Sequence, residues 1–325
     1  SAVPPLQMIA ASDNTLYIST DRGQSFGKAA VLKDEQIRHA VIARSSPGTV
    51  YIAGTRHAYR LRQHSARIFS ADAGEQINFI LEHGGYLYTA TSAGLYYADE
   101  KLLSWQSVPG LQGRPVFSLT AFGDSIYTVG DSGVHLFKHR ESLRRIYTAR
   151  GDDQDGGFKL RHITVDALTP GRLWLATSKG VFLSSDGGDR WRKFYITGAD
   201  HVSVNCLVLS PLDHNRLYLC TDSGFFRVDI SNGRAEPLTA GLPTTFIHWM
   251  DIAAPDRIYL ATARGLFKNE SPAAAPKADL NEILKGEPSI KQVQAAALLY
   301  NSVDPDKTEN WRKRLKYRAL FPKVS

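Results

Sequence analysis

A short strand–turn–strand pattern recurs along the first 268 residues of the chain. In its best copy, Leu173-Trp174-Leu175-Ala176-Thr177 is followed after a turn by Gly180-Val181-Phe182. Similar copies begin at Val50, Leu87, Ile126, Leu217 and Ile258. A looser first copy runs from Met8 to Ala11 and turns at Asp13-Asn14 into Leu16-Tyr17-Ile18. A repeated unit of this kind cannot bury both of its faces alone, so the copies must pack on one another.

The spacing of the copies predicts the fold. From Gly94 onward, successive turn glycines are 39, 47, 44 and 41 residues apart, which suits four strands and their turns. Further apolar strands are expected before the later copies, at His39–Ala43, Val116–Ala121, Val202–Ser210 and Phe246–Ile252. Seven copies therefore predict an all-β, seven-bladed β-propeller. A β-sandwich also has many short strands, but fixed spacing is not typical of it.

The two ends of the repeat array should meet where the ring closes. The first copy has no apolar strand before it, so we expect it to lack an inner strand. The last copy has no clear outer strand after Lys268. The small residue in the strand before each turn, such as Ala90 or Ala176, is expected to let neighbouring blades approach closely.

Two turns carry a more specific motif. Ser184, Asp186, Gly188 and Trp191 fit the pattern Ser-x-Asp-x-Gly-x-x-Trp. Ser19, Asp21, Gly23 and Phe26 fit it with Phe in place of Trp. These turns resemble the Asp-box, or BNR, repeat of propellers such as sialidases, sortilin-type receptors and Ycf48-like photosystem assembly factors. The resemblance implies a structural role, in which the carboxylate accepts backbone N–H groups, rather than a catalytic role for either aspartate.

The motifs of an active site or a metal site are missing from the sequence. The resemblance to sialidases would imply an arginine cluster, a Tyr/Glu pair and an Arg-Ile-Pro-type motif near the start, whereas the nearest match is Gly113-Arg114-Pro115 in mid-chain. The acidic loop Gly151–Gly157 departs from the spacing of a calcium loop. The ten histidines are scattered, and the two cysteines form no Cys-x-x-Cys motif. We therefore expect no enzyme activity, metal or cofactor.

The two cysteines lie at equal distances from Asp213, on consecutive expected strands. A hairpin would place Cys206 opposite Cys220, where a disulfide is geometrically possible. Cys220 occupies the small-residue position of its repeat, which favours two buried thiols. A disulfide would instead indicate an oxidising compartment.

The chain divides into an expected propeller (1–269), a linker (270–279) and a basic helical tail (280–325). Of the net charge of +7, the last fifty residues contribute ten basic and six acidic side chains. The remaining body is nearly balanced, which argues against nucleic-acid binding. Ser289 and Gln292 form a capping box for a first helix to about Tyr300, and Asp304-Pro305 begins a second helix to about Leu320.

The second expected helix is the candidate docking element. Trp311 shares an apolar face with Leu315 and Ala319. The candidate docking residues are Trp311, Arg312, Lys313, Arg314, Lys316 and Arg318. The helical hairpin either packs on the propeller or meets anionic lipid or an acidic partner through its basic face. Nucleic acid is a less favoured partner.

The expected compartment is the bacterial envelope. No apolar run reaches the ~18 residues that span a bilayer, and the sequence starts at Ser1 without Met, as a processed chain or a fragment would. The segment Glu287–Ala296, with Trp311–Arg314 and Leu320-Phe321-Pro322, resembles one that precedes an outer-membrane β-barrel in some Gram-negative envelope proteins. That resemblance implies a periplasmic or otherwise exported domain.

The function expected from the sequence is that of a non-enzymatic propeller scaffold. It would bind protein in the envelope during assembly, secretion or formation of an outer-membrane complex, and its own C-terminal continuation is one candidate partner. A carbohydrate-binding or glycoside-hydrolysing propeller is the main alternative. A Ycf48-like assembly factor for a membrane complex is a narrower one, from which the helical tail departs.

Overall fold

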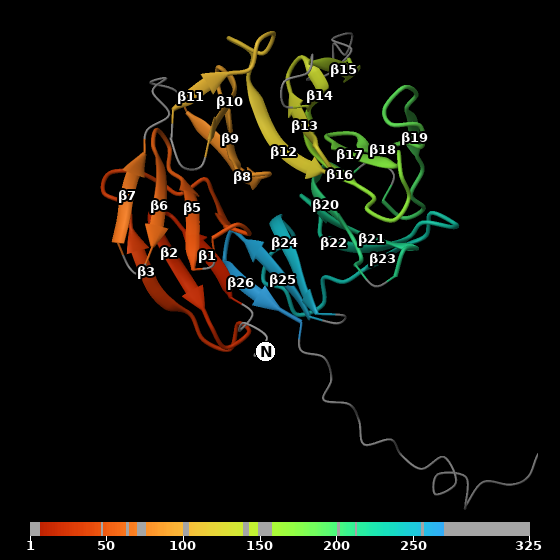
Figure 1. The fold of residues 1–325 in the computed structure, drawn as a ribbon. Coiled ribbons are helices and arrows are strands. Elements are labelled where there is room, and N and C mark those ends of the chain that lie inside the picture. Colours follow the sequence, from red (N-terminus) through yellow and green to blue (C-terminus); the bar gives the residue numbers. More distant parts are fainter. Residues whose placement is uncertain are drawn as a thin grey trace, which may run out of the picture. The chain divides into compact units, whose positions relative to one another are not determined.

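The fold is a seven-bladed β-propeller, as the repeat predicts. The computed structural model describes residues 7–269, except 47, 63–64, 70–75, 100–103, 139–142, 149–157, 200–201, 212 and 255–256. These residues form seven antiparallel sheets arranged as a ring (Figure 1). The expected linker and helical tail, with Trp311 and its basic neighbours, lie outside the described residues.

The strands follow one another blade by blade. Blades 1 and 2 are β1 (Met8–Ser12), β2 (Thr15–Ser19), β3 (Gly27–Val31), then β4 (His39–Ile42), β5 (Thr49–Ala53), β6 (Ala58–Arg62), β7 (Ser65–Phe69). Blades 3 and 4 are β8 (Ile77–His83), β9 (Tyr86–Thr91), β10 (Gly94–Asp99), β11 (Trp105–Ser107), then β12 (Val116–Phe122), β13 (Ser125–Gly130), β14 (Gly133–Lys138), β15 (Arg144–Tyr147). Blades 5 and 6 are β16 (Leu160–Val165), β17 (Leu173–Thr177), β18 (Gly180–Ser184), β19 (Arg192–Phe194), then β20 (Val204–Leu209), β21 (Arg216–Thr221), β22 (Phe225–Asp229), β23 (Ala235–Pro237). Blade 7 is β24 (Ile247–Ala254), β25 (Arg257–Thr262), β26 (Gly265–Lys268).

Blade 1 differs from the expectation for it. The predicted missing inner strand is present, because β1 pairs with β2 as the inner strand of this blade. The segment Leu16-Tyr17-Ile18 is therefore the second strand, and the prediction placed it one strand too late. The described part of blade 1 has only three strands, and blade 7 also has three.

The turn between the second and third strands explains the repeated Thr-x-x-Gly pattern. In blade 5 the Thr177 hydroxyl donates to the Gly180 carbonyl (2.8 Å) and accepts the backbone N–H of Lys179 (3.1 Å). Blades 3, 6 and 7 repeat this pair of bonds. The glycine adopts a φ of 102° in blade 5, a conformation that side chains with a Cβ disfavour.

The core lies between blades rather than within them. Six clusters of buried residues each join two consecutive blades, from blades 1 and 2 around to blades 6 and 7. Trp174, which is fully buried, packs in the cluster between blades 5 and 6. Because each blade is a thin sheet, burial on both faces requires a neighbour on each side.

The two cysteines are free, buried thiols. Cys206 and Cys220 stand opposite each other across β20 and β21, as the hairpin predicts. They belong to the cluster between blades 6 and 7. Burial, together with the neighbouring Cys206 thiol, raises the pKa of Cys220 well above its usual range. This position therefore supports packing.

The ring closes where blade 7 lies beside blade 1 (Figure 1). The hydroxyl of Tyr259 on β25 donates to the backbone carbonyl of Arg22, in the turn after β2, at 2.7 Å. The same ring lies so close to Gly23 that a Cβ there would come within 2.7 Å of Tyr259 Cε1. A glycine in the Asp21 turn thus makes room for the tyrosine that closes the ring.

We predict that Tyr259→Phe lowers the free energy of unfolding by about 0.5–1.5 kcal/mol, because it removes one partly buried hydrogen bond while keeping the ring. Tyr127→Phe is the matched control, since Tyr127 holds the same position in β13 and its hydroxyl has no hydrogen-bond partner among the described residues. Urea unfolding of both variants provides the measurement. Equal losses in the two variants would show that the Arg22 contact does not stabilise the ring.

Candidate functional site

The two aspartate turns expected from the sequence have the same hydrogen-bond pattern. In blade 1 the Ser19 hydroxyl donates to Asp21 Oδ1 (2.7 Å) and accepts the Gly23 N–H (2.8 Å). In blade 5 the Ser184 hydroxyl donates to Asp186 Oδ1 (2.8 Å) and accepts the Gly188 N–H (2.9 Å). Each carboxylate also accepts later backbone N–H groups of its own turn. The carboxylates therefore hold their turns together.

Each turn also contacts the preceding blade. Trp191 Nε1 donates to the carbonyl of Ile146 on β15 at 2.9 Å, and a Cβ on Gly188 would come within 2.8 Å of the Ile146 side chain. Phe26 has no indole N–H, and in the blade 1 turn Tyr259 makes the contact across the junction. The eight motif residues thus lie in two separate turns, on blades 1 and 5, and do not form one site.

The charge of both aspartates is stabilised locally. Hydrogen bonds from Ser25, followed by the one from Ser19, hold the pKa of Asp21 far below its usual range. For Asp186 the backbone N–H of Arg190 is the main cause of a lowered pKa, and Ser184 contributes. A carboxylate held ionised by its own turn is poorly suited to general acid catalysis, which needs a raised pKa.

Sequence reasoning missed a belt of equivalent positions on the seven inner strands. Five inner strands have a β-bulge near their start, and the residue after it pairs with the small residue of the second strand. Including the unbulged blades 1 and 2, this belt consists of Met8, His39, Phe79, Ser118, His162, Cys206 and Trp249. Its members are chemically diverse, so no sequence pattern marks them.

Four rings of the belt meet across the channel. Trp249 lies 5.0 Å from His162 and 6.1 Å from both His39 and Phe79, measured between ring centroids. His39 and Phe79 stack at 3.6 Å. These residues come from blades 2, 3, 5 and 7, which lie on different sides of the ring. These aromatic and imidazole groups therefore close the channel at this level. We call the four rings of His39, Phe79, His162 and Trp249 the plug.

The two histidines of this plug are held neutral. Burial lowers the pKa of His162 to about 4, and burial, together with His162, lowers the pKa of His39 to about 4. His39 keeps part of its surface in solvent, but its Nδ1, like that of His162, is enclosed without a hydrogen-bond partner among the described residues. Protonation would place an unpaired charge in the plug.

The bulged residues form a rim above the plug. Asn78 Nδ2 donates to the carbonyl of Val116 (2.8 Å), and Asn205 Nδ2 donates to that of Ile247 (2.9 Å), so these side chains reach the inner strand of the next blade. With the residue before His39, this rim consists of Arg38, Asn78, Phe117, Arg161, Asn205 and His248. The sequence does not predict the rim, because no residue pattern marks the positions of the β-bulges.

The rim is exposed, aromatic and basic. Phe117 is 40% exposed, and Arg38, Arg161 and His248 are also exposed. Phe246, which is 41% exposed, stacks edge-on against His248 with 4.9 Å between ring centroids. We call this surface, with the neighbouring turns between second and third strands, the rim face.

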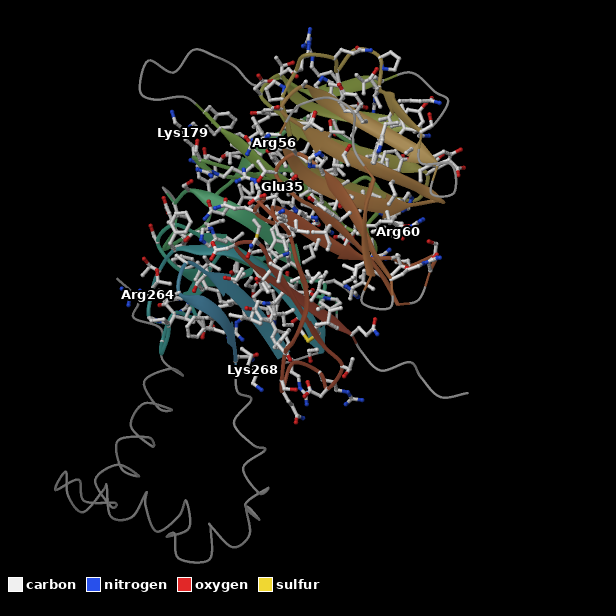
Figure 2. The ribbon with its side chains drawn as sticks, turned by 90° about the vertical axis from the view of Figure 1, so that its left-hand side faces the viewer. Glu35, Arg56, Arg60, Lys179, Arg264 and Lys268 are labelled. Atoms are coloured by element: carbon white, nitrogen blue, oxygen red, sulfur yellow. The ribbon has the colours of Figure 1, made fainter. Side chains whose placement is uncertain are left out.

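The turns around the rim add further positive charge. Arg56, Lys179 and Arg264 occupy these turns in blades 2, 5 and 7, and Lys179 and Arg264 lie on the same side of the propeller (Figure 2). Acidic side chains are present as well, because Asp131 and Asp222 occupy the equivalent turns of blades 4 and 6. The nearby carboxylate of Glu35 pairs with His57 and accepts the backbone N–H of Arg56. The rim face thus offers aromatic and cationic groups.

The described part of the chain contains neither a metal-binding cluster nor a membrane-spanning helix. Among those residues, no three His, Cys, Asp or Glu side chains gather closely enough to hold a metal ion. The acidic loop 151–157 lies outside them. No helix long and apolar enough to cross a membrane occurs within the described ranges.

We predict that the protein loses stability as the pH falls from about 6.5 to about 4. The unfolded chain binds protons at its histidines in this range, whereas His39 and His162 stay neutral in the folded protein. His162→Leu should reduce the slope of unfolding free energy against pH by up to about 1.4 kcal/mol per pH unit. His214→Leu, at an exposed loop position, is the control. Urea unfolding between pH 7 and pH 4.5 measures the slopes, and an unchanged slope for His162→Leu would contradict the account of the plug.

Comparisons with known proteins identify the fold alone. No protein-family model and no curated protein matches the chain. Among solved structures, Ycf48 bound to D1 peptide is 12% identical with a TM-score of 0.64, covering 81% of this chain and 89% of that one. The extracellular domain of the BT4673 one-component system from B. thetaiotaomicron is 15% identical (TM-score 0.67; 82% of this chain, 37% of that one). The ancestral GH74 enzyme AFV00434 is 16% identical (TM-score 0.62; 72% and 36%). The chain thus spans little more than a third of the latter two proteins, and at these identities the likeness shows a β-propeller.

Proposed function

We propose that this protein is a non-enzymatic β-propeller scaffold of the bacterial envelope that binds a partner polypeptide on its rim face. The observation that carries the proposal is the plug: four rings close the channel directly beneath the rim. A closed channel leaves the rim as a surface for contact. We also propose that the two aspartate turns are Asp-box turns that link neighbouring blades.

The composition of the rim face suits a protein partner. Aromatic residues and arginine are enriched at protein interfaces and account for most binding hot spots. Phe117, Phe246 and Arg161 provide both kinds of side chain in exposed positions. The surplus of cations favours a partner segment with acidic residues. A solved propeller of similar fold, Ycf48, is described as bound to a D1 peptide, which supports peptide binding as a use of this architecture.

The alternative is a carbohydrate-active propeller. Its specific support is the similarity in fold to GH74 enzymes. Glycoside hydrolysis normally needs two carboxyl groups about 5–9.5 Å apart at the sugar. The six rim positions include neither Asp nor Glu, and Asp21 and Asp186 are engaged in their turns. The two exposed carboxylates of the neighbouring turns, Asp131 and Asp222, come from separate blades, 4 and 6. The scaffold is therefore the better-supported function.

We predict that a photo-crosslinking residue at Phe117 captures one defined protein in cells, and that the same residue at Leu168 does not. Leu168 is 58% exposed and lies between β16 and β17, at the opposite end of its blade. Replacing both Phe117 and Phe246 with serine should weaken binding of the captured protein by at least about tenfold, because each is expected to anchor the interface. Isothermal calorimetry with the purified pair measures this loss.

Three results would contradict the proposal. Equal crosslinking from Phe117 and Leu168 would show that the rim face is not the interface. Turnover of aryl glycosides at enzyme-like rates would favour the alternative. Recovery of the native protein in the cytoplasm, after cell fractionation, would overturn the envelope location.

A further inference from the structure

The third strand of blade 7, β26, has an unpaired edge. In blades 2 to 6 the third strand pairs with a fourth, outer strand, whereas in the described residues β26 pairs only with β25. An unpaired edge presents backbone donors and acceptors to any extended chain that approaches it. Natural proteins usually cover or blunt such an edge.

Leu266 on β26 is an apolar residue at a position that is buried in the four-stranded blades. It lies opposite the small residue Ala261, and it is 42% exposed. The residues in the same position of blades 2 to 6 are buried to between 0% and 2% exposure: Ala58, Leu95, Val134, Val181 and Phe225. The five equivalent residues are covered by the next blade as well as by an outer strand, since all of them belong to the clusters that join consecutive blades. Leu266 belongs to none of these clusters and has no outer strand beside it among the described residues.

The other blades show what kind of segment covers this position. In blade 3 the N–H of Val108 donates to the carbonyl of Leu95 (2.8 Å), and in blade 6 the N–H of Leu238 donates to that of Phe225 (2.7 Å). In blade 5 Phe194 lies opposite Val181. The covering segment is thus an antiparallel strand with a bulky apolar residue beside the position of Leu266.

The backbone of β26 is ready for such pairing. The N–H of Asn269 donates inward to Ile258, so alternation along the strand turns the N–H and C=O groups of Leu266 and Lys268 outward. The pairing of β26 with β25 has no bulge. The other third strand without an outer partner, β3, is bulged against β2, which makes it a poorer template.

The sequence that follows β26 does not suit this position. In blades 2 to 6 the outer strand begins within eight residues of the end of the third strand. The corresponding residues here are Ser271-Pro272-Ala273-Ala274-Ala275-Pro276. Proline lacks an N–H, and alanine is too small to cover a leucine. This segment is therefore a poor candidate for the outer strand, whereas a separate polypeptide could supply it.

The charges around β26 indicate the chemistry of that polypeptide. Arg264 precedes the strand and Lys268 ends it, and both are exposed (Figure 2). Neither forms an ion pair with another described residue. Acidic side chains flanking an apolar residue would complement this edge.

We propose that β26 is a strand-docking site, where an extended acidic and apolar segment of the partner polypeptide adds as the fourth strand of blade 7. Backbone hydrogen bonds to Leu266 and Lys268 would supply affinity, and an apolar side chain over Leu266 would supply specificity. The inference rests on the proposed function in that the partner is a polypeptide. The β26 site would be a second surface for binding that polypeptide, in addition to the rim face.

The test uses a labelled peptide that copies residues 190–197, the outer-strand segment of blade 5, with Arg192 and Lys193 replaced by Glu. Fluorescence anisotropy with the full chain should show saturable binding. Leu266→Asp should weaken it by about tenfold or more. Val31→Asp, on the bulged edge β3, is the matched control because Val31 is similarly exposed at 47%, and it should leave binding unchanged.

A second pair of variants tests the backbone contact. Lys268→Pro removes an outward N–H, and Lys268→Ala removes only the charge, so the proline variant should bind the peptide more weakly than the alanine variant. A control peptide with Phe194 replaced by Asp should fail to bind. Circular dichroism and thermal unfolding establish that each variant is folded.

The proposal is overturned if the peptide does not bind the full chain, or if it binds Leu266→Asp and Val31→Asp equally well. These outcomes are separable from failure of the rim. Loss of crosslinking at Phe117 with retained peptide binding would contradict the rim face alone, and the reverse would contradict the β26 site alone.

Discussion

Burial between blades is the constraint on which this structure depends. Each sheet is apolar on both faces, so every blade needs two neighbours, and the ring must close. Six junctions are closed by clusters of buried side chains. At the seventh, between blades 7 and 1, Tyr259 reaches the Asp21 turn and bonds to Arg22, where Gly23 makes room for its ring. The Asp186 turn does the same between blades 4 and 5 through Trp191. The aspartate turns are therefore joints of the ring.

Much of the fold follows from local sequence, because its repeated turns have a local cause. A threonine that bonds across its own turn and a glycine at positive φ recur at fixed places, for example at Thr177 and Gly180, so blade number and most strands could be predicted. Blade 1 was misplaced by one strand because its turn at Asp21 lacks this pattern. The rim and the plug could not be predicted, since the bulge at residues such as Asn78 decides which side chains meet at the channel. Trp249 and His162 are brought together only by closure of the ring.

The two candidate contact surfaces have different physical origins. The rim face consists of exposed residues, such as Phe117 and Arg161, that lie above the plug that closes the channel. The β26 edge exists because blade 7 has only three strands among the described residues, which leaves Leu266 open. Both surfaces are basic, with Arg264 beside the rim and next to β26. One partner with an acidic extended segment could therefore use both, and its affinity would then exceed that of either contact alone.

Amide hydrogen exchange at β26 tests the central claim most directly, since that claim is a ring closed by side-chain contacts in which the outer edge of β26 is unpaired among the described residues. In the protein without a partner, the outward amides of Leu266 and Lys268 should exchange much faster than the amides of β18, which lie between two strands. The amide of Tyr259 on β25 should be as protected as its counterpart Tyr127 on β13, because both strands are paired on two sides. Protection of Leu266 and Lys268 equal to that of β18 would contradict the account, since it would mean that the protein already covers this edge.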